Sequence, residues 1–134
     1  MYCLILKKNK KEWTLDGEAH RTKGPAINFS NGEKWWATKG RMNRDHNLPA
    51  VERPNGTKEY WINGQEYNLQ ENGTREFIDL FGKLNREDLP AVEYANGDKE
   101  FWLDGKRHRS DGPAVIYGNK QYWFINGVFI KCIV

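Results

Sequence analysis

A segment of about 23 residues recurs along this 134-residue chain and constrains its fold more than any other feature. Each copy closes on a glycine, and the steps between these glycines are 23, 24, 18, 23 and 22 residues: Gly17, Gly40, Gly64, Gly82, Gly105 and Gly127. A fixed period of this length indicates a repeat architecture. We expect a single repeat domain over 1–134, with copies at about 1–17, 18–40, 41–64, 83–105 and 106–127, a degenerate copy at 65–82 and a terminal strand at 128–134.

Three of the copies alternate apolar and polar residues on both sides of an Asn-Gly pair, which is the pattern of a β-hairpin. Two-residue loops at these pairs would place apolar residues opposite each other: Ile27 opposite Trp36, Val51 opposite Tyr60, and Val92 opposite Phe101. In the last copy, pairing Val115 with Trp123 requires a bulged three-residue turn at Gly118-Asn119. The sequence therefore predicts an all-β protein, an antiparallel meander of repeated hairpins in a single twisted sheet.

Counting back from the closing glycines separates the two faces of the second strand of each hairpin. The residues four and two places before each glycine are nearly all apolar and are predicted to form the core: Trp13, Trp36, Tyr60, Ile78, Phe101 and Trp123, and Leu15, Thr38, Ile62, Leu80, Leu103 and Ile125. The opposite face mixes glutamates with large rings: Trp35, Trp61, Trp102, Tyr122 and Phe124. These rings either form a contact surface or pack over the stems of side chains on adjacent strands.

The copy between Gly64 and Gly82 lacks its Pro-Ala strand. We interpret the remaining ENGTREFIDLFGKL as the second strand of a copy. The alternative is a short helix near residues 72–84, because four apolar residues also fall at helical spacing: Phe77, Leu80, Phe81 and Leu84. With either structure, the array divides here into two pairs of copies.

Composition narrows the functional classes. The formal net charge of +3 comes from 21 basic and 18 acidic side chains in close mixture, which argues against specific nucleic-acid binding. The apolar residues 1–6 are too few for a membrane span or a signal-peptide core, so a cytoplasmic protein is expected. Cys3 and Cys132 have no metal-ligand spacing, and we expect free thiols, with a disulfide between them as the alternative.

The phrases FWLDGKRHRSDGPAVIY and YWINGQEY resemble the MORN repeat, over about residues 9–127 apart from the degenerate copy. An Arg stands where that family has a Gly after its His: Arg21, Arg44, Arg86 and Arg109. This His-Arg…Gly-Pro-Ala form is similar to repeat proteins of phages and large viruses. The resemblance implies a single-layer antiparallel sheet used for assembly and partner binding, without an active site. Phospholipid contact, which some family members make, is not carried over because of the Arg.

A His or Asn precedes each of these arginines at the same phase: His20-Arg21, Asn43-Arg44, Asn85-Arg86 and His108-Arg109. A row of guanidiniums along one edge of the sheet would suit phosphates or carboxylates. Repetition in nearly every copy instead favours an architectural role, with pairing to nearby acids such as Asp111 or, across the sheet, Glu52 and Glu93. His and Asn can both hydrogen-bond a turn, and two lone imidazoles do not make a metal site.

No Cys-His pair in register, nucleophile elbow or P-loop is present, so we expect neither an enzyme nor a cofactor. The expected function is non-catalytic binding by a phage or viral accessory protein that inhibits a host defence or regulatory protein. The predicted binding residues are Trp35, Trp61, Trp102, Tyr122, Phe124, Arg44, Arg86, Arg109, His20 and His108. One alternative is a sponge for a nucleotide or other anionic ligand. Another is self-assembly through Tyr2 to Leu6 and Val128 to Val134, and a homodimer is expected.

Overall fold

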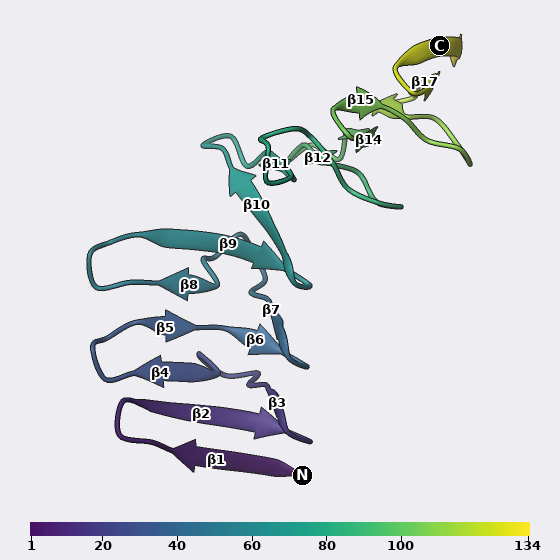
Figure 1. The fold of residues 1–134 in the computed structure, drawn as a ribbon. Helices are drawn as coiled ribbons and strands as arrows, with labels where there is room; N and C mark the ends of the chain where they lie inside the picture. Colours follow the sequence, from purple (N-terminus) through teal and green to yellow (C-terminus); the bar gives the residue numbers. More distant parts are fainter. The chain divides into compact units, whose positions relative to one another are not determined.

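The computed structural model describes residues 1–134 and contains β-strands but no helix (Figure 1). The chain forms two compact units, Met1–Glu66 and Tyr67–Val134. All strand pairs are antiparallel, and consecutive hairpins follow one another in each unit, which confirms the predicted all-β meander. The helix considered for 72–84 is wrong. That segment contains the short strand β11 (Arg75–Glu76) and an antiparallel bridge between Ile78 and Leu84.

The first unit is built from short strands in the order β1-β2-β4-β5-β8-β9. Its hairpin tips lie along one edge and its closing turns along the other (Figure 1). β3 adds to β2, while β6 and β7 form a separate pair. The strands are β1 (Tyr2–Leu6), β2 (Lys10–Leu15), β3 (Glu18–Ala19), β4 (Ile27–Phe29), β5 (Lys34–Trp35), β6 (Ala37–Thr38), β7 (Arg41–Met42), β8 (Val51–Glu52), β9 (Lys58–Ile62) and β10 (Gln65–Leu69), which runs into the second unit.

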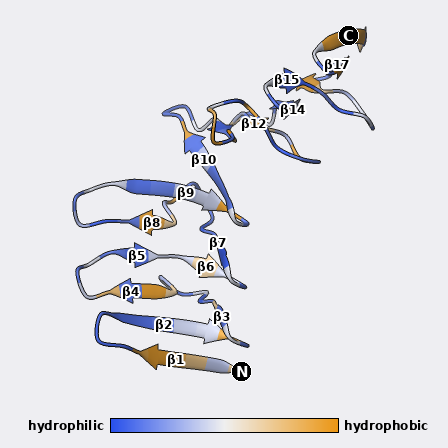
Figure 2. Ribbon diagram, viewed as in Figure 1, coloured by the Kyte–Doolittle hydropathy of each residue, from blue (hydrophilic) through white to orange (hydrophobic).

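The second unit has the order β10-β11-β12-β13-β16-β17-β18, and β14 pairs separately with β15. Apolar residues concentrate in the first strand of each hairpin, such as β4 and β8, while the second strands begin with charged residues (Figure 2). The remaining strands are β12 (Val92–Glu93), β13 (Lys99–Glu100), β14 (Trp102–Leu103), β15 (Lys106–Arg107), β16 (Val115–Tyr117), β17 (Lys120–Ile125) and β18 (Val128–Ile133).

The predicted hairpin register is wrong by one residue. Ile27 pairs with Trp35, Val51 with Glu59, and Val92 with Glu100. The cause is a three-residue loop at each Asn-Gly. In the first, the Gly32 N–H donates to Phe29 O at 3.0 Å, and Gly32 adopts φ 97°. This geometry is a turn followed by a glycine bulge. A one-residue shift exchanges the two faces of a strand relative to its partner.

The last hairpin departs from its prediction in the opposite direction. Tyr117 pairs with Lys120, so Gly118-Asn119 is a tight two-residue loop without the bulge that we expected. Val115 consequently lies opposite Tyr122 and not Trp123. Gly118 has φ 62° at the first loop position, a conformation that glycine adopts without steric cost.

The closing glycines belong to a second set of hairpins. Asn63 and Gly64 have φ values of 50° and 79°, as in a type I′ turn. The same pair of positive values recurs at four more closing turns: Asp16-Gly17, Lys39-Gly40, Asp104-Gly105 and Asn126-Gly127. Each full copy therefore contains an Asn-Gly hairpin and a tighter closing hairpin.

Small side chains, not rings, are the most buried. The alanines that follow each proline have no exposed surface, and one β-branched residue beside each is almost as buried: Ala26, Ala50, Ala91 and Ala114, and Ile27, Val51, Val92 and Val115. The single core face that we predicted is wrong. Leu80 and Ile125 on that face are exposed, whereas Phe77 and Glu100 on the other face are buried. In a one-layer sheet, burial comes from side chains that fold over both faces.

Candidate functional site

A cation lies over a ring in five copies. It stands four residues after the closing glycine, and the ring belongs to the preceding strand. The distances from the charged group to the ring centroid are 3.8 Å for Arg21 on Trp13, 3.8 Å for Arg44 on Trp36, 3.8 Å for Arg86 on Phe77, 4.0 Å for Arg109 on Phe101 and 4.7 Å for Lys131 on Trp123. Such contacts stabilise both the ring and the guanidinium.

The four arginines also bind the backbone of their own copies. Each donates from Nη1 to the carbonyl oxygen of the next proline, at 3.3 Å (Arg21 to Pro25), 2.9 Å (Arg44 to Pro49), 3.1 Å (Arg86 to Pro90) and 3.1 Å (Arg109 to Pro113). Three of the acid partners considered from the sequence are confirmed: Glu52 for Arg44, Glu93 for Arg86 and Asp111 for Arg109. These guanidiniums therefore hold each Pro-Ala strand against a ring.

The His and Asn side chains before these arginines share one task. Each accepts a hydrogen bond from the backbone N–H of the first residue in the next closing turn: His20 Nδ1 from Lys39 at 2.9 Å, Asn43 Oδ1 from Asn63 at 2.9 Å, Asn85 Oδ1 from Asp104 at 2.7 Å and His108 Nδ1 from Asn126 at 3.0 Å. Imidazole and amide are equivalent here because both offer an acceptor atom.

The degenerate copy replaces this bond with a local one. Tyr67 occupies the position of His20, and the turn that follows has three residues, Leu80 to Gly82. Within this turn, Asp79 Oδ1 accepts from the N–H of Phe81 at 2.9 Å and from that of Lys83 at 3.0 Å. Asp79 thus supplies the acceptor that His or Asn supplies elsewhere.

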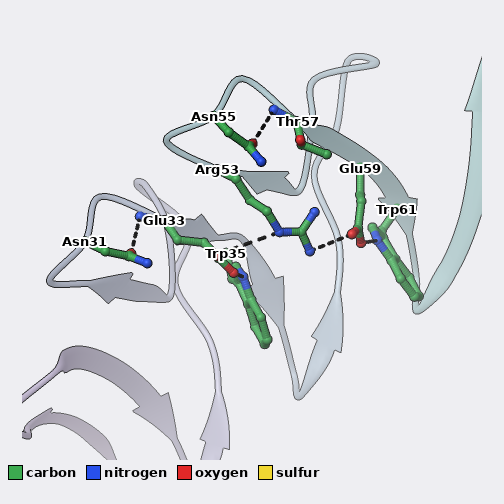
Figure 3. Close-up of polar contacts among 8 residues, drawn as sticks. All are labelled: Asn31, Glu33, Trp35, Arg53, Asn55, Thr57, Glu59 and Trp61. Carbon is green, nitrogen blue, oxygen red and sulfur yellow. Dashed lines mark hydrogen bonds and ion pairs between the residues drawn. The ribbon is translucent and has the colours of Figure 1, made fainter.

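Two indoles of the first unit are fixed by a charged network (Figure 3). Trp35 Nε1 donates to Glu33 at 2.6 Å, and Trp61 Nε1 donates to Glu59 at 2.9 Å. Arg53 joins the two carboxylates, with Nη2 at 2.7 Å from Glu59 and Nε at 3.7 Å from Glu33. Both rings are partly exposed, and neither can rotate without breaking a hydrogen bond.

The two indoles line a small pocket of about 180 Å³ together with Met42, Val51 and the Arg53–Glu59 pair. Partial burial would raise the pKa of Glu59, but hydrogen bonds from Trp61 and Arg53 outweigh it and lower the pKa. Glu59 therefore stays ionised and keeps both indoles in place near neutral pH. The pocket is the size of one or two side chains, and chemically it is an apolar cleft with a charged rim.

The second unit repeats the indole–carboxylate bond around a buried acid. Trp102 Nε1 donates to Glu100 at 2.8 Å, and the hydroxyls of Tyr94 and Tyr117 donate to the same carboxylate at 2.5 and 2.6 Å. Burial would raise the pKa of Glu100, but donation from Tyr117, Tyr94 and Trp102 outweighs it and lowers the pKa. Burial and the bond to Glu100 raise the pKa of Tyr94 and of Tyr117.

The ten binding residues predicted from the sequence do not form one site. Trp35 and Trp61 line one pocket, whereas Arg44 lies over Trp36, which neighbours Trp35 along the strand and points to the other face. Tyr122 contacts Tyr117 edge-on, and Phe124 contacts Phe129 in the same way. His20 is buried beside Lys39.

Three of the ten do meet in a second pocket. Arg86, His108 and Arg109 line a cleft of about 240 Å³ in the second unit. Three carboxylates line it as well, from Glu87, Asp88 and Asp111. Like charge in the cleft opposes an anionic ligand, and both guanidiniums already bind a proline carbonyl.

Sequence reasoning missed the residues that fix the indoles. Glu33, Arg53 and Glu59 were read as surface charges, although a Glu stands two places before Trp35, Trp61 and Trp102 alike. Residues two apart in a strand share a face, so this recurring Glu-x-Trp was the available signal. Arg53 has no recurring signal, because it stands in one copy only.

Comparisons with protein-family models, with curated proteins and with solved structures find no match to this chain. No three His, Cys, Asp or Glu side chains gather in a way that could hold a metal ion. Both cysteines are free and exposed. None of the elements is a helix of the length and hydropathy that a membrane crossing requires.

Proposed function

We propose that this protein is a non-catalytic binding protein that docks on another protein through its fixed indoles. Trp35 and Trp61 form the centre of the contact, and Trp102 forms an equivalent feature on the second unit. In line with the resemblance to phage repeat proteins, the partner is a host defence or regulatory protein, which docking inhibits in the host cytoplasm.

The observation that carries the proposal is the Glu33–Arg53–Glu59 network, which holds two partly exposed indoles beside an apolar pocket. Tryptophan dominates the binding energy of protein interfaces when it fills or lines such pockets. Rings already held in one orientation lose little conformational entropy on binding. Neither the fold nor the stacking of arginines on the other face requires the Trp61 ring to be exposed.

The test uses the tagged full chain in cells of its natural host, followed by binding measurements with the captured protein in purified form. We expect Trp35→Ala with Trp61→Ala to raise the Kd at least tenfold, since each interface indole contributes about 2 kcal/mol or more. The matched control is Lys34→Gln with Lys58→Gln, on the same strands. An unchanged Kd in the tryptophan variant, with its circular dichroism intact, would rule out this face.

Self-assembly is the second candidate, and the exposed edge strand β1 favours it. Tyr2, Leu4 and Leu6 are 70%, 50% and 67% exposed, and β1 pairs with β2 alone. An exposed apolar edge strand is a template for pairing with another chain. β18 is also apolar, but it carries Lys131 and an irregular register at Trp123/Phe124, features that blunt an edge.

The oligomeric state distinguishes this candidate from docking through the indoles. Light scattering over a hundredfold range of concentration should show a dimer that Leu4→Lys converts to a monomer, because the lysine brings charge into the shared edge. The substitution Val128→Lys at the other edge serves as the comparison. A wild-type monomer at all concentrations would remove the self-assembly candidate and leave the tryptophan face untouched.

A further inference from the structure

The tip of the first hairpin concentrates positive charge. Lys7, Lys8, Lys10 and Lys11 stand within five residues, where β1 turns into β2. The Lys7 N–H donates to Lys10 O at 2.9 Å, so these two lysines face each other across a two-residue loop. Like charges directly opposite in a hairpin are destabilising. Nothing in the fold requires this arrangement, because two other hairpin tips carry an acid at their exit, Glu33 and Asp98.

Little of this charge is neutralised within the protein. Lys10 Nζ forms an ion pair with Glu12 at 3.3 Å, while Lys7, Lys8 and Lys11 form none. Lys7, Lys8 and Lys11 are exposed, and Lys10 is partly buried. Positions where a sequence breaks local stability rules without compensation are often functional. An anion bound at this tip would remove the repulsion.

A pocket lies at the same place. It has a volume of about 320 Å³ and is lined by the four lysines together with Trp13, Asn28, Phe29 and Ser30. No carboxylate lines it, in contrast to the pocket beside Arg86 and Arg109. The lining therefore combines ammonium groups with two rings, an amide and a hydroxyl.

We propose that this pocket binds a phosphorylated ligand with an aromatic ring, that is, a ligand of nucleotide chemistry. The lysines would hold the phosphates by charge-assisted hydrogen bonds. Trp13 and Phe29 would supply apolar surface for the base, and Asn28 and Ser30 its hydrogen-bonding partners. The proposal does not depend on the tryptophan face, and it locates an anionic ligand away from the His-Arg series.

A compact ligand suits this site better than a nucleic-acid strand. Beyond the tip, Lys10 is bound to Glu12, and the adjacent strands carry Glu33, Glu52 and Glu59 among their lysines. A strand tracking across the sheet would meet these carboxylates, whereas an extended basic groove is what single-stranded nucleic acid requires.

The test is calorimetric titration of the full chain at low salt with four probes: ATP, tripolyphosphate, adenosine and a short single-stranded oligonucleotide. We expect ATP to bind more tightly than tripolyphosphate, and adenosine not to bind measurably. Lys8→Gln with Lys11→Gln should weaken ATP about tenfold or more, because two charge-assisted contacts are lost. Lys34→Gln with Lys58→Gln removes the same charge outside the pocket and should have little effect.

Trp13→Phe tests the ring contribution in a protein that still folds, because Phe101 occupies the equivalent position in another copy. This variant should weaken ATP and leave tripolyphosphate unchanged. Lys7→Gln provides a readout without ligand. It should raise the melting temperature by relieving the repulsion with Lys10, and the gain should shrink when ATP is present.

Three results would overturn the proposal. Equal affinity for tripolyphosphate and ATP would show that the rings contribute nothing. Tighter binding of the oligonucleotide than of ATP would point to nucleic acid as the ligand. Equal effects of the two lysine pairs would show only a diffuse response to net charge. Trp35→Ala with Trp61→Ala should leave ATP binding intact, so the failure of one proposal can be told from that of the other.

Discussion

His20 accepts the backbone N–H of Lys39 at 2.9 Å, nineteen residues further along the chain. The bond links one copy to the closing turn of the next, and Asn43, Asn85 and His108 make the same link in their copies. In a type I′ turn the first residue points its N–H away from the hairpin, so a partner must come from elsewhere. This shared demand explains why His and Asn alternate at one position of the repeat.

Exchange within this pair should therefore be tolerated. We expect His20→Asn to retain most of the free energy of unfolding, because Asn places an acceptor at the same position. His20→Ala should lose about 2 kcal/mol, since it leaves the Lys39 N–H without its partner and a gap at a buried site. Urea unfolding of both variants measures the difference. Equal losses would mean that the imidazole ring packs and the hydrogen bond contributes little.

Arg86 is the most buried member of the arginine series, with 8% of its side chain exposed. Arg86→Ala should cost about 2 to 3 kcal/mol, because the stack on Phe77, the bond to Pro90 O and the pair with Glu93 are lost together. Arg86→Lys should recover only part, since an ammonium lacks the planar fork. Chemical denaturation provides the values, and Lys99→Ala is an exposed control. A full recovery with lysine would contradict the stacking role.

The tip of the degenerate copy makes a clear contrast. Leu80 and Phe81 are 101% and 86% exposed, whereas Phe77 is 2% exposed. Leu80→Ser with Phe81→Ser should leave the melting temperature within a few degrees of wild type. Phe77→Ser should lower stability by about 3 kcal/mol or more. Differential scanning calorimetry would decide. A large loss from the tip variant would mean that these side chains are buried in solution.

Glu100 makes stability depend on acid pH. Its pKa is lowered below the usual value of 4.5, so its ionised form is favoured in the folded chain. This contribution is fully present above pH 4.5 and is lost as the pH falls through the lowered pKa. Glu100→Gln should reduce the slope of stability against pH in that range, because Gln cannot titrate. Thermal melts between pH 2 and 6 test this, and Glu71→Gln, at an exposed site, is the control.

The sequence identified the class of fold because the Asn-Gly and closing glycines mark both ends of every second strand. It misplaced the register because Asn31-Gly32 fits a two-residue loop and a three-residue loop equally well as a pattern. The choice between them rests on the twist that flanking strands impose. Gly118-Asn119 shows the converse, since only its backbone conformation, with φ 62° at the glycine, identifies a tight turn.

The candidate site was only half visible in the sequence. Trp35 and Trp61 were recognisable as rings on the less apolar face. Their grouping depends on the register, which decides that Trp35 and not Trp36 meets Val51. Arg53 could not be found, because its value lies in bridging two carboxylates from different hairpins. The architectural role considered for the arginines does rest on a visible feature, their recurrence beside Pro-Ala.

The links between neighbouring copies all have one reach of about twenty residues, and most join backbone to backbone. Such a scaffold is modular. A whole 23-residue copy could be spliced in or removed without designing a new interface, provided that the slot before each arginine keeps a lone pair directed at the following bend. Evolution of this chain by duplication would need no other innovation, and an engineer could adjust its length by the same rule.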